Sequence, residues 1–476
     1  RAYTYRDRVR GDLMRAVTAS LHIIEIPFID PLTAFAPFSE EPVGAFFDSA
    51  AESGGQGRYS YIATDPFKVL GAEFANSINP FELLSQELAQ YNLPRHPNLP
   101  PFQTGAAGIL GYEMGRHLEK LPTPKPLGQG FPEMVVGLYD TVAAFDNQAR
   151  KAWVLASDVA NEMPASTREL AETRAQKMAA RISASKTLDE LNIDSCGHWN
   201  VETSREEYEK LLSRVIDYIH AGDIFQANLT QRLTGIIPDS LDKFMLYRRL
   251  RALNPAPFAA YLSCGKDEAV LSASPELFLS LDEAGNITTR PIKGTRPRGA
   301  TESEDAVLKG VLQNSEKDRA ENLMIVDLLR NDLSRVCEIG SVRVGHLYHL
   351  ETFATVHHLV SEISGRLRPD LGPIDLLQAT FPGGSITGAP KIRAMEIIHE
   401  LESAHRGPYC GSIVRIGFDG SMDSNIVIRT LTVKGKSVVA QAGGGIVADS
   451  SPGAEYEESL TKIFPLLQAL DPKFTL

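Results

Sequence analysis

The sequence predicts an α+β protein whose strands are largely antiparallel. Three observations carry this prediction: short strand-like segments punctuated by Gly and Pro at the start, a well-capped amphipathic helix near the middle, and closely spaced strands followed by a helix near the end. Hydrophobic residues make up 43% of the 476 residues and charged residues 23%, as in ordinary globular proteins with a sizeable core.

The chain divides into a β-rich region (1–155), a linker (156–200) and a third region (201–476). In the first region we expect strands around 45–47, 59–62, 105–109 and 134–139, because each is a short apolar run bounded by turn residues. The linker is polar and Ala-rich, with a helix expected from Ser166 to about Ser185 that has no clear apolar stripe.

The third region opens with the sharpest local signal. Ser204 and Glu207 form a capping box, apolar residues recur at helical spacing from Tyr208 to Ile219, and Gly222 ends this helix before a strand at 224–229. Near the C-terminus, 410–418, 425–433 and 437–442 predict a three-stranded meander. A last helix is expected to begin near 451–452, where proline suits the first turn.

Charge and cysteine content exclude several classes of protein. A formal net charge of −12 provides no general basic field for nucleic acid or an anionic membrane, so an anionic substrate needs local cations or a metal. The four cysteines show neither metal-type nor disulfide-type spacing, and no apolar stretch approaches the roughly 20 residues that span a bilayer. We therefore expect a cytoplasmic protein without membrane or nucleic-acid partners.

Lys293 lies between a β-like segment and a Gly-containing turn. One interpretation is a solvated lysine in a basic loop. The other is a nucleophile, which requires the neutral amine; we expect burial and the neighbouring Arg290, Arg296 and Arg298 to favour that form.

Glu321 falls on the same helical stripe as Ile325 and Leu328, so its carboxylate needs a partner. A buried ion pair to Arg319 or Arg330 would provide one. A magnesium ion would provide another, since Mg²⁺ takes one or two carboxylates.

The last helix carries Glu455, Glu458 and Lys462 on one face, which alone is typical of a solvated charged surface. Directly before it, however, stand Gly443, Gly444 and Gly445. Three glycines allow backbone amides to approach an anion, so loop and helix together would hold a carboxylate and a metal.

Arg429 is expected to point inward with Val427 and Leu431, where either a buried carboxylate or a carboxylated substrate would meet it. Other candidates are ambiguous one by one: Glu276, Tyr409, His358 and Ser385. The loop 383–391 lacks phosphate-loop spacing, so we reject nucleotide binding.

Together these residues make the chain resemble the chorismate-utilising enzyme family, and within it the aminodeoxychorismate synthase branch. The motifs run in order through residues 204–465: 274–276, 291–295, 317–332, 356–359, 382–391, 428–431 and 443–462. The resemblance implies a fold of two facing antiparallel β-sheets with helices packed outside, similar to anthranilate synthase. Residues 1–155 are similar to the family's N-terminal part and 201–476 to its chorismate-binding part.

Two positions separate the branches of this family. A lysine at position 293 matches the aminodeoxychorismate synthases, whereas anthranilate synthase large subunits carry a small residue there. Isochorismate and salicylate synthases place a water-activating lysine at the position of Gln226, and a glutamine amide cannot act as that base.

The resemblance also implies roles. Mg²⁺ would be held by Glu321 and Glu458, and by Glu455 through water. The ring carboxylate of chorismate would meet the metal, Lys462 and the amides of 443–445. The enolpyruvyl carboxylate would meet Arg429 and Tyr409. Glu276 would be the general acid and Lys293 the covalent nucleophile that ammonia displaces. The remaining pocket residues would be His358, Ser385 and Gln226.

No cysteine stands in a Gly-x-Cys-x-Gly nucleophile turn, so the resemblance implies a separate glutamine amidotransferase, component II, as the ammonia source. The product, 4-amino-4-deoxychorismate, would lead to 4-aminobenzoate and folate. The alternative is anthranilate synthase component I; a non-catalytic chorismate or tryptophan sensor is the alternative from another class. Relatives bind tryptophan through Leu-Leu-Glu-Ser; 46–49 here read Phe-Phe-Asp-Ser, and Ser49, Tyr59 and Ser60 either line such a pocket or pack a sheet.

Overall fold

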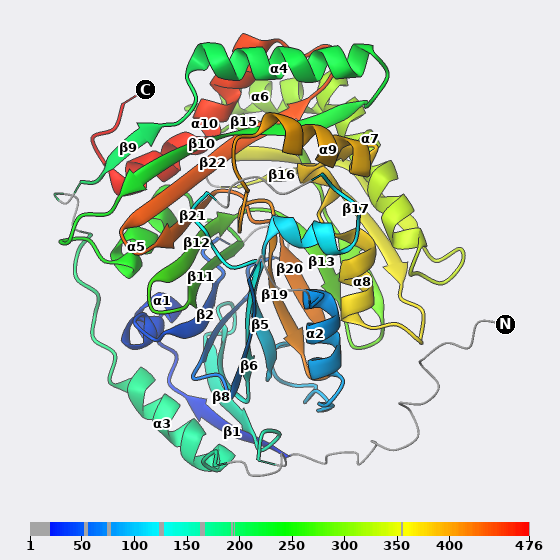
Figure 1. Cartoon of the computed structure of the whole chain (residues 1–476). Helices are drawn as coiled ribbons and strands as arrows, with labels where there is room; N and C mark the ends of the chain where they lie inside the picture. Colours follow the sequence, from blue (N-terminus) through cyan, green and yellow to red (C-terminus); the bar gives the residue numbers. More distant parts are fainter. Residues whose placement is uncertain are drawn as a thin grey trace.

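Two antiparallel β-sheets face each other, with helices on their outer sides, as the resemblance implied (Figure 1). The computed structural model describes residues 20–475 except 52–55, 74–77, 123–127, 162–166, 192, 193, 195 and 354–355. Within these residues, no helix has both the length and the apolar character needed to cross a membrane.

The first sheet has 12 strands. In spatial order they are β1 (Leu21–Ile26), β8 (Lys151–Ser157), β7 (Thr141–Asp146), β3 (Tyr59–Thr64), β2 (Val43–Asp48), β11 (Phe258–Cys264), β12 (Glu268–Ser274), β21 (Thr430–Lys434), β22 (Ser437–Ile446), β10 (Gln226–Ile236) and β18 (Gly388–Ala389), with β9 (His198–Val201) also paired to β10.

The second sheet has 10 strands. Their order is β15 (Ile292–Pro297), β17 (Val356–Arg366), β14 (Asn286–Thr289), β13 (Leu277–Leu281), β20 (Met422–Asn425), β19 (Ser412–Gly417), β5 (Gly105–Leu110), β6 (Met134–Tyr139) and β4 (Lys68–Ala72), with β16 (Arg343–Thr352) also paired to β17.

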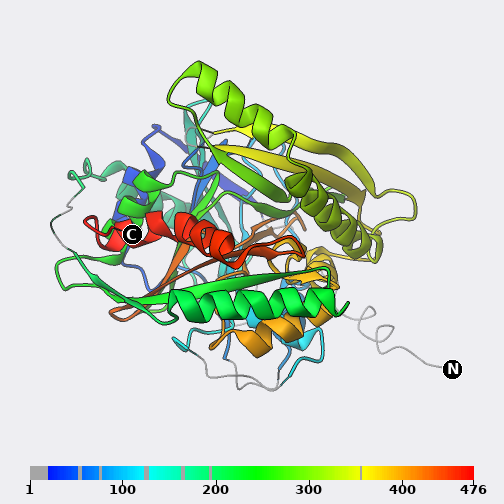
Figure 2. The same ribbon diagram turned by 90° about the horizontal axis from the view of Figure 1, so that it is seen from above.

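The helices pack mainly outside these sheets, and Figure 2 shows α10 between α4 on one side and α6 with α7 on the other. The α-helices are α1 (Pro31–Phe35), α2 (Pro80–Leu88), α3 (Ala171–Ser183), α4 (Arg205–His220), α5 (Lys243–Leu253), α6 (Glu302–Gln313), α7 (Glu316–Ser334), α8 (Pro373–Thr380), α9 (Lys391–Leu401) and α10 (Pro452–Leu470). Short 3₁₀ turns are η2 (Ala36–Phe38), η3 (Tyr112–His117) and η4 (Gly384–Ile386).

Alternation along the strands builds the core between the sheets. In β2, Ala45 and Phe47 face the cluster shared with β5, β6 and β19, while Phe46 packs on the outer cluster that includes α1 and α5. The predicted strands around 45–47, 59–62, 105–109 and 134–139 are therefore confirmed as β2, β3, β5 and β6.

The first and third regions share both sheets. β2 pairs with β11 in one sheet, and β5 pairs with β19 in the other. The division of the chain near residues 155 and 200 stays a prediction. Strands from before and after these positions belong to the same two sheets.

The predicted starts of two helices are confirmed, and a third helix differs from expectation. The capping box of Ser204 and Glu207 opens α4, and α10 begins at Pro452. The start predicted for α3, Ser166, lies outside the described residues, but residues 167–170 are not helical and α3 begins only at Ala171. The expectation that α3 lacks an apolar stripe is wrong, because Ala171, Ala175, Met178 and Ile182 form a buried stripe in which two small alanines gave only a weak signal.

The predicted C-terminal meander is also wrong. β19 and β20 form one hairpin and β21 and β22 another, but the hairpins belong to different sheets. The chain crosses between the sheets at residues 426–429.

Candidate active site

The site lies where the chain changes sheet twice. Residues 275–276 connect β12 to β13, and 426–429 connect β20 to β21. Ser274 Oγ donates to the carbonyl of Ile426 (2.6 Å), and the amide of Ala273 donates to the carbonyl of Arg429 (3.0 Å). These bonds hold the two crossings, and with them Glu276 and Arg429, beside each other.

Glu276, Ser385 and Lys293 form a connected group. The Glu276 carboxylate is buried, and it accepts hydrogen bonds from the Ser385 hydroxyl and the Ile292 amide. Lys293 Nζ donates to the carbonyl of Ser385 (3.2 Å). Burial raises the pKa of Glu276, although Ser385 and Lys293 oppose that rise, so this carboxyl keeps its proton to higher pH than an exposed glutamate does.

The arginines expected to crowd Lys293 are paired elsewhere. Arg290 pairs with Glu351, Arg296 with Asp318 at 2.9 Å, and Arg298 with Asp305 at 2.7 Å. That expectation is wrong, because each guanidinium pairs with a carboxylate of another element, in β16, α7 or α6. The half-buried Lys293 interacts electrostatically with Glu276, Glu321 and Glu458 instead.

Three carboxylates from two helices alternate with lysines. Glu321 comes from α7; Glu455 and Glu458 come from one face of α10, as predicted. Lys317 Nζ lies 3.1 Å from Glu455 Oε1 and 3.9 Å from Glu321 Oε1, and Lys462 Nζ lies 2.6 Å from Glu458 Oε1.

This cluster shifts the ionisation of its members in opposite directions. Burial raises the pKa of Glu321, with the Glu455 carboxylate adding to the rise and Lys293 and Lys317 opposing it. Although burial works against it, the Lys462 ammonium lowers the pKa of Glu458.

The ion pairs proposed for Glu321 from sequence, to Arg319 or Arg330, do not form, because both arginines contact other residues. Arg330 pairs with Asp327 (2.9 Å), and the Arg319 guanidinium lies over the Tyr348 ring. Lys317, four residues before Glu321, was missed, although the spacing of four on a helix was the signal that would have found it.

The carboxylate oxygens of this cluster are of the type that binds a divalent cation, although they do not converge on a single point. Over the described residues, no three His, Cys, Asp or Glu side chains form a ready-made metal cluster. Yet Glu455 Oε2 and Glu458 Oε1 lie 3.2 and 3.7 Å from the point that a Cβ on Gly444 would occupy. The missing side chain leaves room between these hard oxygen donors, the ligand type that Mg²⁺ prefers, and Lys462 Nζ borders the same point at 3.7 Å.

The three glycines are part of a strand and not of a loop, which corrects the prediction. Gly443, Gly444 and Gly445 belong to β22 and pair with Thr230, Leu229 and Asn228 of β10. β21 pairs with β22 only as far as Ala440, so no strand of the described residues pairs with the other edge of the glycine segment. Lys462 Nζ donates to the Gly443 carbonyl from α10 (3.0 Å).

Gln226 is packed against the glycine segment and Lys293. A Cβ on Gly445 would lie 1.8 Å from Gln226 Nε2 and would displace that amide, whereas Lys293 Nζ, at 3.4 Å, would be in ordinary contact with it. Gln226 is buried, and its Oε1 has no hydrogen-bond partner among the described residues.

Arg429 does not lie in a strand as predicted. It adopts φ 53° at the crossing, and its Nη1 donates to the carbonyl of Lys462 (2.6 Å). Within the described part of the chain, no carboxylate lies within ion-pair distance of it, and Glu458 interacts with it electrostatically from farther away. Buried Tyr409 and His358 interact electrostatically with this guanidinium.

His358 is kept neutral by its surroundings. Burial lowers the pKa of His358 to about 3, and the Arg429 charge adds to that effect. Its Nδ1 lies 2.8 Å from the hydroxyl of Thr295, across the pairing of β15 with β17. His358 is therefore a neutral polar residue lining the site and not an acid near neutral pH.

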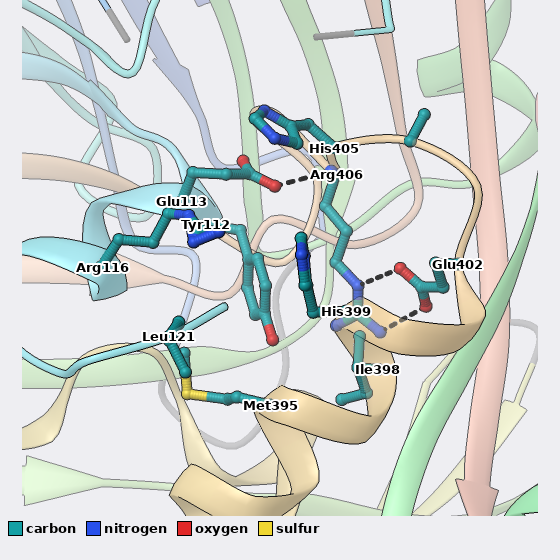
Figure 3. Close-up of a pocket in the computed structure, with 11 residues that line it drawn as sticks. Tyr112, Glu113, Arg116, Leu121, Met395, Ile398, His399, Glu402, His405 and Arg406 are labelled. Atoms are coloured by element: carbon teal, nitrogen blue, oxygen red, sulfur yellow. Dashed lines mark hydrogen bonds and ion pairs between the residues drawn. The ribbon is translucent and has the colours of Figure 1, made fainter. Parts of the chain in front are cut away.

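A small, partly open cavity is lined from η3, the end of α9 and the segment that follows it up to Arg406 (Figure 3). Its volume is about 30 Å³, room for a water molecule and far below the several hundred Å³ of a ligand pocket. Buried Arg406 pairs with Glu402 (2.6 Å) and donates to the carbonyls of Ile386 (2.9 Å) and Asn228 (2.6 Å). Sequence patterns missed this brace under the Ser385 turn.

The N-terminal residues proposed to surround tryptophan border a second cavity. Ser49 and Tyr59 line a space of about 470 Å³ between the sheets, together with Arg415. Ser60 does not line it; its hydroxyl accepts the Ser49 amide at 3.2 Å.

The family model for chorismate binding enzymes matches residues 47–468. The chain belongs to the chorismate binding enzyme family. It is 43% identical to aminodeoxychorismate synthase component 1 of Klebsiella aerogenes, over 92% of this chain and 96% of that protein. It is 38% identical to anthranilate synthase component 1 of Thermus thermophilus, over 93% and 95%.

Among solved structures of the family, anthranilate synthase component I from Streptococcus pneumoniae TIGR4 matches with a TM-score of 0.77 and 32% identity, covering 86% of this chain and 92% of that chain. The family membership and the paired-sheet fold predicted from sequence are thus confirmed.

Proposed function

We propose that this chain aminates chorismate to 4-amino-4-deoxychorismate, on the route to 4-aminobenzoate and folate. The observation that carries the proposal is the placement of Lys293 against Ser385, beside Glu276 and the α7–α10 carboxylates. The 43% identical relative named aminodeoxychorismate synthase component 1 supports it.

The proposed chemistry uses two groups in turn. Lys293 Nζ, as the neutral amine, bonds to C2 of the ring; the double bonds shift, and the C4 hydroxyl departs as water with a proton from Glu276. Ammonia then bonds to C4, the C2–Nζ bond breaks to release Lys293 as the neutral amine, and the proton shed by the new C4 ammonium goes to the Glu276 carboxylate, which restores the acid. The raised pKa of Glu276 supports its role as the donor.

The substrate carboxylates would meet the fixed cations. Lys462 and the free edge of 443–445 would hold the ring carboxylate, and Arg429 with Tyr409 would hold the enolpyruvyl carboxylate. Magnesium, held by Glu321 and Glu458 with Glu455 through water, would supply charge neutralisation for the ring carboxylate. His358, Ser385 and Gln226 would complete the wall.

Ammonia would come from a glutamine amidotransferase, component II. The name component 1 of the relatives supports a partner component. Burial raises the pKa of Cys410 to about 12 and that of Cys337 to about 11, so neither thiol is an activated glutaminase nucleophile. The cavity beside Ser49 and Tyr59 is of a size to take tryptophan.

The test is mass spectrometry of the protein with chorismate and Mg²⁺ but without ammonia. We expect a substrate-derived mass on the peptide that contains Lys293, absent from Lys293→Ala. With ammonia added, the wild-type protein should form 4-amino-4-deoxychorismate. Release of fluorescent anthranilate instead would establish the alternative, anthranilate synthase. The 38% identical relative with that name is the reason to test it.

A further inference from the structure

The two oxygens of Glu455 have different surroundings. Oε1 accepts hydrogen bonds from Lys317 Nζ (3.1 Å) and Ser450 Oγ (2.7 Å). Oε2 lies 3.2 Å from the position of a Cβ on Gly444, a point that Glu458 Oε1 and Lys462 Nζ each approach to 3.7 Å. The carboxylate is buried, so it cannot turn without losing both bonds at Oε1.

The two donors come from different parts of the fold. Lys317 lies in the first turn of α7, one turn before Glu321. Ser450 lies between β22 and α10, and its hydroxyl also accepts the amide of Val447 (3.1 Å). One donor is charged and the other neutral, yet both fix the same oxygen.

We propose that Lys317 and Ser450 are positioning residues that turn Glu455 Oε2 toward Gly444, where it takes part in binding a divalent cation. The inference rests on the proposed function, because the cation is the magnesium proposed there. It adds an outer layer of donors to that site, and such layers commonly control metal affinity by holding the ligand in one orientation.

Simple electrostatics predicts the opposite effect for Lys317. Its ammonium stands beside Glu455 and Glu321, so it repels a second cation, and its removal would strengthen metal binding if charge alone decided. If orientation decides, removal weakens binding in spite of the lost repulsion. Ser450→Ala separates the two effects, because it removes a donor without changing charge.

The experiment is calorimetric titration of the full chain with MgCl₂. We expect Lys317→Met and Ser450→Ala each to weaken Mg²⁺ binding about tenfold or more. Lys317→Arg keeps a donor and should stay close to wild type. The matched control is Lys210→Met on α4, which removes the same charge from an exposed i,i+4 pair with Glu206 and should change nothing.

Thermal melts without Mg²⁺ verify that each variant folds, and the Ser450 variant tests the idea even if a Lys317 variant does not. Tighter binding by Lys317→Met, or unchanged binding by Ser450→Ala, overturns the positioning role while leaving the amination proposal intact. Absence of Mg²⁺ binding in the wild-type chain overturns both this inference and the proposed metal, whereas the amination assay tests the function separately.

Discussion

Replacement of Glu276 by glutamine removes an acidic proton while keeping the shape of the side chain. The carboxylate is 5% exposed and accepts bonds from the Ser385 hydroxyl and the Ile292 amide. The amide oxygen of glutamine can keep one of these bonds, and the residue volume is nearly unchanged. We therefore expect substrate binding to survive and proton donation to the leaving hydroxyl to fail.

The expected loss falls on kcat. A positioned general acid contributes about 10²–10⁴-fold, which corresponds to about 3–5 kcal/mol of transition-state stabilisation. KM should change by less than about threefold, because neither proposed carboxylate contact involves Glu276. The same variant should form the Lys293 adduct slowly, since that step needs the same proton.

The assay is product formation from chorismate, Mg²⁺ and ammonium across pH, with ammonia held constant as the free base. The wild-type rate should fall as pH rises through the Glu276 pKa, at a higher pH than for an exposed glutamate because burial raises that pKa. This alkaline fall should be missing in Glu276→Gln. A variant with more than a tenth of wild-type kcat and an unchanged pH profile would refute the general-acid role.

The remaining predictions concern binding and stability. Ser385→Ala removes a hydrogen bond that lowers the pKa of Glu276, so the alkaline fall of kcat should move to higher pH. Arg429→Lys loses bidentate geometry and should raise KM for chorismate about tenfold with less effect on kcat. Burial raises the pKa of Glu113 from 4.5 to about 7, so the folded chain binds the extra proton. The free energy of unfolding should then fall by up to about 3 kcal/mol from pH 4.5 to 7 in denaturant titrations. In Glu113→Gln this fall with pH should be smaller. Glu402→Gln leaves a buried guanidinium uncompensated and should cost about 3–5 kcal/mol, seen as a lower melting temperature.

Patterns that depend on near neighbours in sequence predicted the elements well. The capping box of Ser204, the proline start of α10 and the apolar strands of the first region all depend on contacts within a few residues. The stripe of α3 was missed because Ala171 and Ala175 are too small to stand out in hydrophobicity, although small side chains let the helix lie close to the sheet.

The sequence predicted which residues belong to the site better than it predicted how they are arranged. Glu455, Glu458 and Lys462 share a helical face, which the period of 3.6 residues shows directly. The alternation of charges with Lys317 crosses from α10 to α7, over 138 residues of sequence, and no local pattern contains it. For the same reason, proximity in sequence wrongly placed the arginines around Lys293.

The failed strand prediction at 425–433 has a physical cause that bears on function. Val427 and Leu431 are both buried, but Val427 packs between the sheets and Leu431 packs in the outer cluster, because the backbone between them is held to the other crossing through Ala273 and Ser274. Arg429 therefore takes φ 53°, a conformation that costs a non-glycine residue of order 1 kcal/mol or more and persists where surrounding contacts enforce it. Released from the ladder, its guanidinium reaches the Lys462 carbonyl at the end of the acidic helix face. The local rule fails at the residue that the proposed substrate carboxylate needs, because a regular strand would direct position 429 with Leu431 into the outer apolar cluster under the helices.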